Sequence, residues 1–180
     1  ESAFDTLGFR QELPFEIKMS QSQYANEGGI DTEIQLADSG YGQGEMLVNP
    51  LHMAALYTAF VNEGDVIKPY LRYQEDIQPE SWITQAFDRD AANTVKSALE
   101  QVVNSPDGTG YAAHREDIRL AGKTGTAEIK TAKDDQTGTE LGWFAVFTAE
   151  PDAEQPLLLI SMAEDVKERH GSTYVVEKDK

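Results

Sequence analysis

The last third of the chain contains three runs of strand-forming residues, and this pattern limits the fold more than any other feature. The runs cover 118–129, 142–148 and 156–162, with polar or proline-containing links between them. Short links favour an antiparallel meander. Because the second and third runs are almost continuously apolar, both faces of the sheet should be covered. The pattern therefore predicts an α+β fold, with an antiparallel sheet covered by helices.

A helix is predicted upstream of these runs, with clear signals at both ends. Asn49 is placed as its N-cap, Pro50 as its first residue and Gly64 just past its end. Apolar residues recur inside it at three- and four-residue spacing and predict a stripe that is buried against the core. The residues of this stripe are Met53, Leu56, Tyr57, Phe60 and Val61.

A second helix is predicted from Asp88 or Asp90 to about Val103, ended by the turn-forming residues 106–108. Its expected apolar face consists of Val95, Leu99 and Val102. Residues 18–45 are polar and glycine-rich and indicate a long ordered loop. Residues 66–73 indicate a short extended segment at a sheet edge, since Pro69 interrupts it.

The last residues, 172–180, begin like a helix and stop after little more than two turns. Three strands are also few for a sheet that is covered on both sides. Both observations favour an incomplete domain, cut at both ends.

The charge of the chain limits its partners. With 32 acidic and 15 basic residues the net charge is −17, so the surface should repel nucleic acid and anionic lipid headgroups. No apolar run approaches the roughly 20 residues that cross a bilayer, and the first residues lack a signal sequence. The absence of cysteine excludes disulfides and is compatible with either redox compartment.

The string from Gly122 to Thr126 reads Gly-Lys-Thr-Gly-Thr and has two very different uses in proteins. A phosphate-binding P-loop needs a glycine at position 117, where this chain has Asp, and it needs a helix after the lysine. Here the chain continues as a predicted strand. A surface strand with an incidental lysine is the other ordinary interpretation.

Residues 121–128, Ala-Gly-Lys-Thr-Gly-Thr-Ala-Glu, resemble the Lys-Thr-Gly signature of the penicillin-binding proteins. Residues 39–45, followed by Asn49-Pro50 and a helix, are similar to the segment before that signature in class B transpeptidases, and most resemble the low-affinity, methicillin-resistance type. Residues 108–113 and 142–144 also resemble family segments. The resemblance covers essentially residues 8–175. It implies the β-lactamase/transpeptidase-like fold.

The resemblance also implies roles for individual residues. Lys123 would supply a cation beside a relay serine, and the Thr124 hydroxyl would hydrogen-bond the terminal carboxylate of a stem peptide. Gly125 would leave room for the ligand, and the Thr126 amide would form half of the oxyanion hole. Tyr41, between two glycines, either lines the cleft or has a structural role in a turn. No metal or other cofactor is implied.

The motif that would hold the nucleophile is absent. None of the nine serines is followed three positions later by lysine, and no Ser-x-Asn triplet occurs. In the family both motifs lie upstream of the segment that residues 39–45 resemble. We therefore expect residues 1–180 to be the C-terminal portion of a transpeptidase domain. The fragment alone should be inactive.

The remaining polar and aromatic residues have plainer interpretations. His52, His114 and His170 lack ligand spacing, and the carboxylate pairs at 134–135 and 164–165 lack a calcium-loop pattern. Solvation or packing is the expected role of each. Core packing is also expected for Trp143, Phe144 and Phe147.

As a whole, the resemblance implies part of a peptidoglycan D,D-transpeptidase that works through a serine acyl-enzyme and binds β-lactams. Its parent would be anchored by an upstream segment at the extracytoplasmic face of the cell membrane. Two alternatives remain open. One is a β-lactamase or β-lactam sensor of the same fold, and the other is a non-catalytic scaffold domain.

Overall fold

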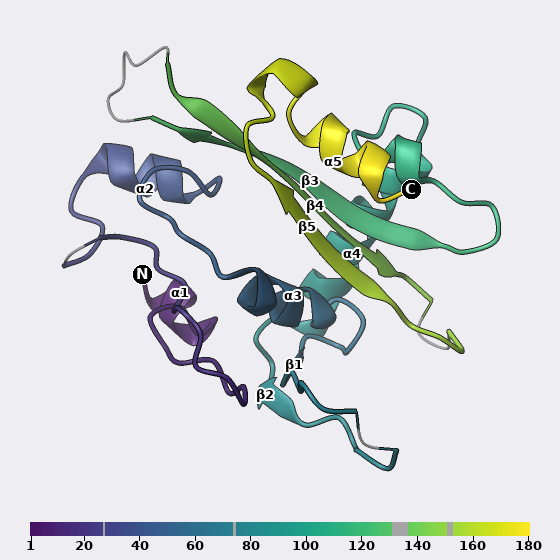
Figure 1. Ribbon diagram of the computed structural model, residues 1–180. Helices are drawn as coiled ribbons and strands as arrows, with labels where there is room; N and C mark the ends of the chain where they lie inside the picture. The colour runs from purple at the N-terminus through teal and green to yellow at the C-terminus, as the bar shows by residue number, and fades with distance from the viewer. Residues whose placement is uncertain (27, 74, 131–136, 151–152) are drawn as a thin grey trace. The chain divides into compact units, whose positions relative to one another are not determined.

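The structure of the protein is a computed structural model that describes residues 1–26, 28–73, 75–130, 137–150 and 153–180. The chain divides into two compact units, Glu1–Asn93 and Thr94–Lys180. Figure 1 labels the elements of both units. Each unit has its own cluster of buried apolar residues and is described by itself.

The first unit is mostly helical and irregular. It contains α1 (Ser2–Thr6), α2 (Glu33–Ser39) and α3 (Pro50–Thr58), with β1 (Val66–Ile67) and β2 (Ser81–Ile83) paired antiparallel. Aromatic and aliphatic side chains from the N-terminal segment, α3 and β1 form its core. The buried members of this core are Phe9, Tyr24, Ala25, Ala55, Leu56, Ala59 and Val66.

Helix α3 begins where the sequence predicts. The Asn49 side chain accepts a hydrogen bond from the Leu51 amide at 2.9 Å and caps the helix, and Pro50 is its first residue. The helix ends at Thr58, earlier than predicted, and turns carry the chain on to Gly64, whose φ is +99°.

The predicted apolar stripe of α3 is partly right, since Leu56 is buried and Met53 is half-buried and packed against the core of the first unit. The helix buries His52, Ala55 and Leu56, and only Leu56 belongs to the predicted set. Nearly the whole surface of this helix is apolar, so the period of its side chains does not select one face.

The loop predicted at 18–45 is wrong at residues 33–39, which form helix α2. A capping box stabilises the N-terminus of this helix: the Gln35 amide donates to the Thr32 hydroxyl, and the Gln35 side chain accepts from the Thr32 amide. The Thr-x-x-Gln spacing of residues 32–35 is typical of a capping box and could have predicted the start of this helix. The extended segment predicted at 66–73 is confirmed only at β1, and Pro69 lies beyond the strand.

The second unit contains the predicted antiparallel meander. Strands β3 (Leu120–Ile129), β4 (Thr139–Thr148) and β5 (Leu158–Ala163) lie in the order β3-β4-β5, and Figure 1 shows them side by side. The register is regular, with Lys123 opposite Ala145 and Gly125 opposite Trp143.

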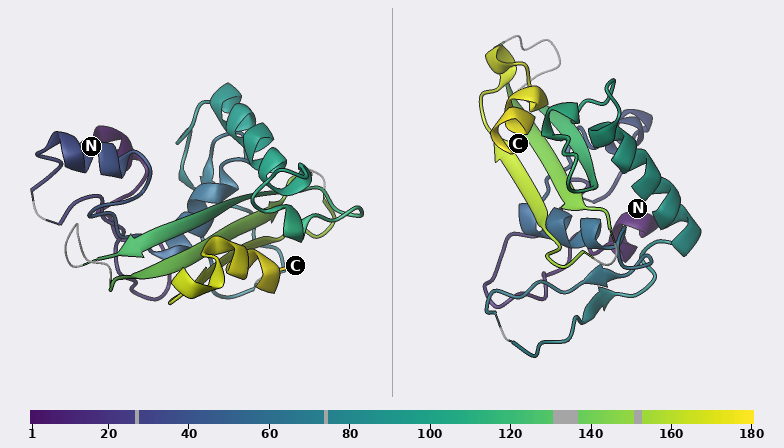
Figure 2. Two further views of the ribbon diagram at one scale, coloured as in Figure 1. Left: turned by 90° about the horizontal axis from the view of Figure 1, so that it is seen from above. Right: turned by 90° about the vertical axis from the view of Figure 1, so that its right-hand side faces the viewer.

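Helices cover the face of this sheet that carries Phe144. The covering elements are the C-terminal part of α4 (Arg89–Asn104), the 3-10 turn η1 (Tyr111–Ala113) and α5 (Ser172–Lys178), while η2 (Lys167–Arg169) precedes α5. Figure 2 shows α5 lying along one face of the sheet. The core there consists of Val103, Ala113, Phe144, Val146, Val175 and Val176.

Helix α4 begins and ends close to its predicted bounds. Its start is fixed by the Asp88 side chain, which accepts hydrogen bonds from the amides of Asp90 and Ala91. Its predicted face is only partly right. Leu99 is buried, but Val95 is 42% exposed and the fully buried residue is Val103. The core of the second unit meets only the C-terminal end of the helix. None of the helices in the described part of the chain is long and apolar enough to cross a membrane.

Candidate active site

The outer edge of β3 carries backbone groups that β4 does not use. The Ala149 amide donates to the Arg119 carbonyl, and the register continues without a shift along the whole strand pair. Since backbone groups alternate in direction along an antiparallel strand, odd-numbered residues of β3 pair with β4. The amides and carbonyls of Thr124 and Thr126 therefore point away from β4, toward the edge of the described sheet.

Thr124 lies on the covered face of the sheet, opposite Phe144. Its side chain is nearly buried, with 7% of the residue exposed. Its hydroxyl oxygen is 2.7 Å from the hydroxyl oxygen of Thr109, so the two form a hydrogen bond in which either can donate. This pairing fixes the position of the Thr124 hydroxyl at the edge of the strand.

Lys123 lies on the opposite face and is exposed. Its ammonium group donates to the Thr124 carbonyl at 2.6 Å, which holds the cation beside the open edge of β3. Because a lysine ammonium has three donors, this bond leaves two for a ligand.

Two glycines of β3 differ in what surrounds them. A Cβ on Gly122 would come within 2.6 Å of the Ala145 carbonyl oxygen and 3.0 Å of a Val103 methyl group. Among the described residues, a Cβ on Gly125 would meet only the Trp143 Cβ, at an ordinary 3.5 Å. The fold therefore requires glycine at 122, whereas the packing of the described residues leaves space at 125.

Thr126 is linked to the start of α5. Its hydroxyl accepts a hydrogen bond from the Ser172 amide at 3.2 Å, on the covered face of the sheet. This bond joins the middle of β3 to the first residue of the helix that covers it.

Tyr41 lies in the first unit, in the turn that follows α2. Its hydroxyl donates to Asp38 at 2.9 Å, the residue is 70% exposed, and Gly42 has a φ of +80°. This environment is that of a turn with an exposed aromatic ring. Because Tyr41 and β3 belong to different units, a shared site for Tyr41 and Lys123 stays a prediction.

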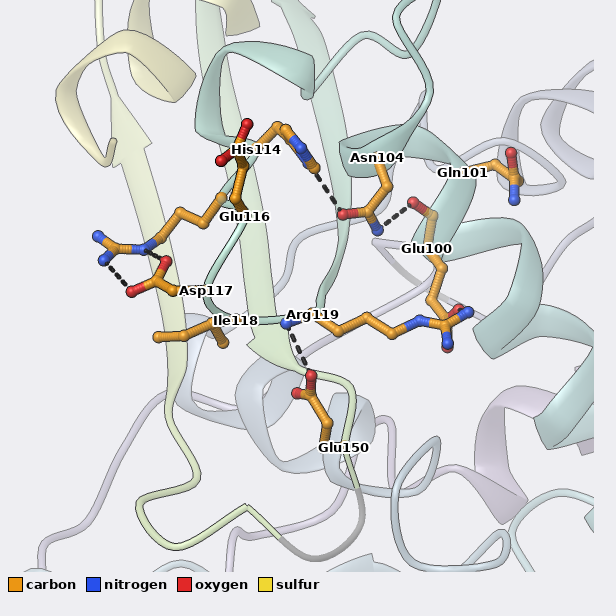
Figure 3. Close-up of a pocket in the computed structure, with 10 residues that line it drawn as sticks. Glu100, Gln101, Asn104, His114, Glu116, Asp117, Ile118, Arg119 and Glu150 are labelled. Carbon is orange, nitrogen blue, oxygen red and sulfur yellow. Dashed lines mark hydrogen bonds and ion pairs between the residues drawn. The ribbon is translucent and has the colours of Figure 1, made fainter.

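A polar hollow of about 390 Å³ lies beside the first residue of β3, and Figure 3 shows its lining. It is bounded by the end of α4, by residues 114–119 and by Glu150, and none of the residues from Lys123 to Thr126 lines it. Arg115 and Asp117 form an ion pair there, and this contact lowers the pKa of the Asp117 carboxyl. Arg119 pairs with Glu100, and its amide donates to Glu150 at 2.8 Å.

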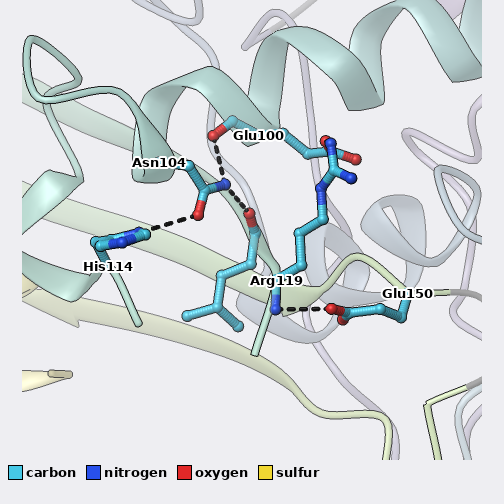
Figure 4. Close-up of polar contacts among 6 residues, drawn as sticks. Glu100, Asn104, His114, Arg119 and Glu150 are labelled. Atoms are coloured by element: carbon cyan, nitrogen blue, oxygen red, sulfur yellow. Dashed lines mark hydrogen bonds and ion pairs between the residues drawn. The ribbon is translucent and has the colours of Figure 1, made fainter. Parts of the chain in front are cut away.

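At the wall of this hollow, Asn104 makes hydrogen bonds within α4, to β3 and to His114 (Figure 4). Its amide nitrogen donates to the carbonyls of Glu100 and Leu120, at 2.8 and 2.7 Å. Its amide oxygen accepts from the Nδ1 of His114 at 3.1 Å. The end of α4 is thereby joined to the start of β3. Sequence reasoning missed this contact, since nothing local relates Asn104 to a residue 16 positions later.

The other candidate residues mostly have packing or surface roles. His52 is fully buried, while Phe144 and Phe147 are 0% and 2% exposed, as predicted for packing residues. Trp143 is half-buried and Asp165 accepts from the Thr139 hydroxyl. Residues 134–135 lie outside the described residues. Over the ranges that the structure describes, no group of three or more His, Asp or Glu side chains could hold a metal ion.

Comparison with known proteins identifies relatives over almost the whole chain. Residues 1–177 match the family described as the penicillin binding protein transpeptidase domain. Penicillin-binding protein 3 of Bacillus subtilis (strain 168) is 42% identical over 175 residues, which cover 97% of this chain and 26% of that protein. Peptidoglycan D,D-transpeptidase MrdA of Salmonella typhimurium (strain SL1344) is 31% identical over 108 residues, or 54% of this chain and 17% of MrdA. The chain thus spans about a quarter or less of these relatives.

Solved structures share the fold. The transpeptidase domain of penicillin-binding protein 3 from Burkholderia pseudomallei matches with a TM-score of 0.74 at 22% identity, over 99% of this chain and 54% of that one. PBPA from Mycobacterium tuberculosis matches with a TM-score of 0.73 at 18% identity, over 99% of this chain and 42% of that one. The predicted α+β, transpeptidase-like fold is confirmed.

Proposed function

The chain belongs to the transpeptidase-domain family of penicillin-binding proteins, and from this premise we propose that it is the C-terminal portion of a serine D,D-transpeptidase domain that cross-links peptidoglycan stem peptides. Curated relatives named peptidoglycan D,D-transpeptidases support this reaction class. The observation that carries the proposal is the edge of β3. A cation, a hydroxyl and two outward-facing amides lie there within four residues.

In the proposed reaction a serine hydroxyl attacks the carbonyl carbon of the penultimate D-Ala of a stem peptide. The peptide bond to the terminal D-Ala breaks, the terminal D-Ala leaves with a proton, and an acyl-enzyme remains. The amine of a second stem peptide then attacks this ester, which forms the cross-link and restores the serine. A β-lactam would acylate the same serine by opening of its ring.

Each residue of the β3 edge has a part in this scheme. Lys123 holds its charge beside the edge, where it would stabilise the substrate carboxylate and a relay serine. The Thr124 hydroxyl would donate to that carboxylate. The substrate would lie along β3 as an added strand, and the Thr126 amide would point at the tetrahedral oxyanion. The space beside Gly125 would receive the ligand, and Tyr41 would line the cleft.

The nucleophile would come from an upstream segment with Ser-x-x-Lys and Ser-x-Asn motifs. The coverage of 54% of a solved transpeptidase domain supports this arrangement, as does the lack of both motifs in these 180 residues. The parent protein would be anchored at the extracytoplasmic face of the membrane.

A β-lactamase or β-lactam sensor of the same fold is the first alternative, and a scaffold domain without a nucleophile is the second. The residues of the β3 edge do not distinguish these three functions, since the choice depends on the nucleophile and on the base that serves it. Relatives named as transpeptidases favour the transpeptidase over both alternatives.

Intact-mass spectrometry after incubation with a penicillin tests the proposal. We expect one added penicillin mass on the chain extended upstream through the missing motifs, and no addition to residues 1–180 alone. Lys123→Ala should slow acylation of the extended chain roughly 10- to 100-fold, because a hydrogen bond to a charged group is lost. Lys130→Ala is the matched control, since this exposed lysine pairs only with Glu128 among the described contacts.

An extended chain that remains unmodified would favour the scaffold alternative. Labelling of residues 1–180 would mean that the nucleophile lies within this chain. Rapid hydrolysis of the acyl-enzyme, with turnover of the penicillin, would instead favour a β-lactamase.

A further inference from the structure

Thr109 is the residue whose side chain contacts the proposed substrate-binding hydroxyl. It lies in the turn between α4 and η1, 15 positions before Thr124, and its hydroxyl oxygen is 2.7 Å from that of Thr124. Thr109 itself is exposed, whereas Thr124 is 7% exposed. The hydroxyl pair therefore lies at the boundary between the core of the second unit and the surface.

The glycines on either side of Thr109 allow this contact. A Cβ on Gly108 would collide with the carbonyl oxygen of Val102, and a Cβ on Gly110 would lie 3.2 Å from the Phe144 ring. The Gly110 amide also donates to the Val102 carbonyl at 2.9 Å. The turn is thus packed tightly against the end of α4 and against Phe144, which lies opposite Thr124 on β4. Its geometry fixes where the Thr109 hydroxyl lies.

The direction of the hydrogen bond determines what Thr124 can do. A threonine hydroxyl has one proton to donate and can accept with its oxygen. If Thr124 donated to Thr109, no proton would remain for a ligand. If Thr109 donates to Thr124, the Thr124 proton stays available, and accepting a bond makes it a stronger donor. A carboxylate can only accept, so its binding selects the second arrangement.

We propose that Thr109 is a positioning residue that donates to Thr124 and thereby directs the Thr124 proton toward the carboxylate of the substrate or β-lactam. This inference rests on the proposed substrate-binding role of Thr124. It adds a residue outside the Lys-Thr-Gly string to the determinants of carboxylate recognition. Thr109 acts through Thr124 and need not touch the ligand.

The test is the acylation rate of the extended chain with a penicillin that has a free carboxylate. Thr109→Val keeps the shape of the side chain without its hydroxyl, and we expect it to slow acylation roughly three- to tenfold. Thr109→Ser should restore the rate. In a Thr124→Val background the further effect of Thr109→Val should fall below about twofold, since the two residues act as one unit. Thr109→Ala serves as a second variant without the hydroxyl.

Thr139→Val is the matched control, because it removes another side-chain hydrogen bond from the same unit, the one to Asp165. It should leave the rate unchanged. Two outcomes would overturn this inference but leave the role of Thr124 intact. One is equal slowing by Thr109→Val in the wild-type and Thr124→Val backgrounds. The other is a wild-type rate for Thr109→Val when Thr124→Val is slow. An extended wild-type chain that is not acylated, or a Thr124→Val variant with an unchanged rate, would overturn the role of Thr124 itself and the inference with it.

Discussion

Gly122 and Gly125 lie three residues apart on β3, and the space around them differs. The first packs against the carbonyl of Ala145 and a Val103 methyl group, whereas the second, within the described ranges, has only an ordinary contact with Trp143. Glycine at 122 is thus explained by the packing of the second unit. Glycine at 125 is not explained by the packing around it, and a ligand that approaches the strand closely would account for it.

Alanine should lower stability at position 122 but not at position 125. We expect Gly122→Ala to lower the free energy of unfolding by about 1–3 kcal/mol, because backbone and core side chains must move. Gly125→Ala should be neutral or stabilising by roughly 0.5 kcal/mol, since alanine loses less entropy than glycine in a strand. Chemical denaturation of residues 1–180 measures both. Under the proposed function, Gly125→Ala should nevertheless slow acylation of the extended chain, and equal destabilisation by both variants would contradict the distinction.

His52 should make the first unit sensitive to acid. It is completely buried, accepts from the Ser22 hydroxyl at 2.7 Å and donates to the Leu7 carbonyl at 2.9 Å. Burial lowers the pKa of His52, although the Leu7 carbonyl opposes this shift. The unfolded chain therefore binds a proton near pH 6.5 that the folded chain does not bind until lower pH. The contribution of His52 to stability is complete above this pH and decreases as the pH falls below it.

We expect this loss to approach about 1.4 kcal/mol per pH unit between the two pKa values. Denaturation of the wild type and of His52→Gln at pH 7 and pH 5 measures it, since all other titrating groups are shared. The wild type should lose more stability than the variant on acidification. An equal loss in both proteins would show that His52 does not titrate differently in the folded state.

At the scale of elements, one side chain joins the end of α4 to the start of β3. Asn104 makes three hydrogen bonds there, to Glu100, Leu120 and His114. Since β3 carries the candidate site, this junction sets where the strand begins relative to the helix that covers it. The contact with Leu120 lies three residues before Lys123.

Removal of this junction should destabilise the second unit. We expect Asn104→Ala to lower the free energy of unfolding by about 2–3 kcal/mol, because three partners lose a hydrogen bond. Gln101→Ala, an exposed position on the same helix, should change it by less than about 0.5 kcal/mol. Thermal or denaturant unfolding measures both variants. Similar values for the two would mean that water replaces the side-chain contacts of Asn104.

At the scale of the whole molecule, the net charge of −17 acts against the compact state. Raising the ionic strength from 0.01 to 0.15 M shortens the Debye length from about 30 to about 8 Å, which screens this repulsion. We expect the midpoint of thermal unfolding to rise over this range at neutral pH. A falling midpoint would mean that favourable ion pairs, such as Arg115 with Asp117, outweigh the net repulsion.

The sequence by itself determined the type and the approximate bounds of the main elements. Pro50 and Asn49 define the start of α3 locally, and the runs at 118–129, 142–148 and 156–162 match the three strands. The Lys-Thr-Gly string, together with the segments at 39–45, 108–113 and 142–144, identified the family. These signals are local, because capping, alternation and turn chemistry depend on neighbouring residues.

Only the tertiary structure decided which faces are buried and which residues meet across the chain. The burial of Val103 and the exposure of Val95 depend on where the core of the second unit meets α4, and the period of the helix alone does not contain this information. The contacts of Thr109 with Thr124, and of Asn104 with Leu120, likewise join residues about 15 positions apart. The side chains at the ends of such contacts are related by packing, and packing is a property of the folded chain.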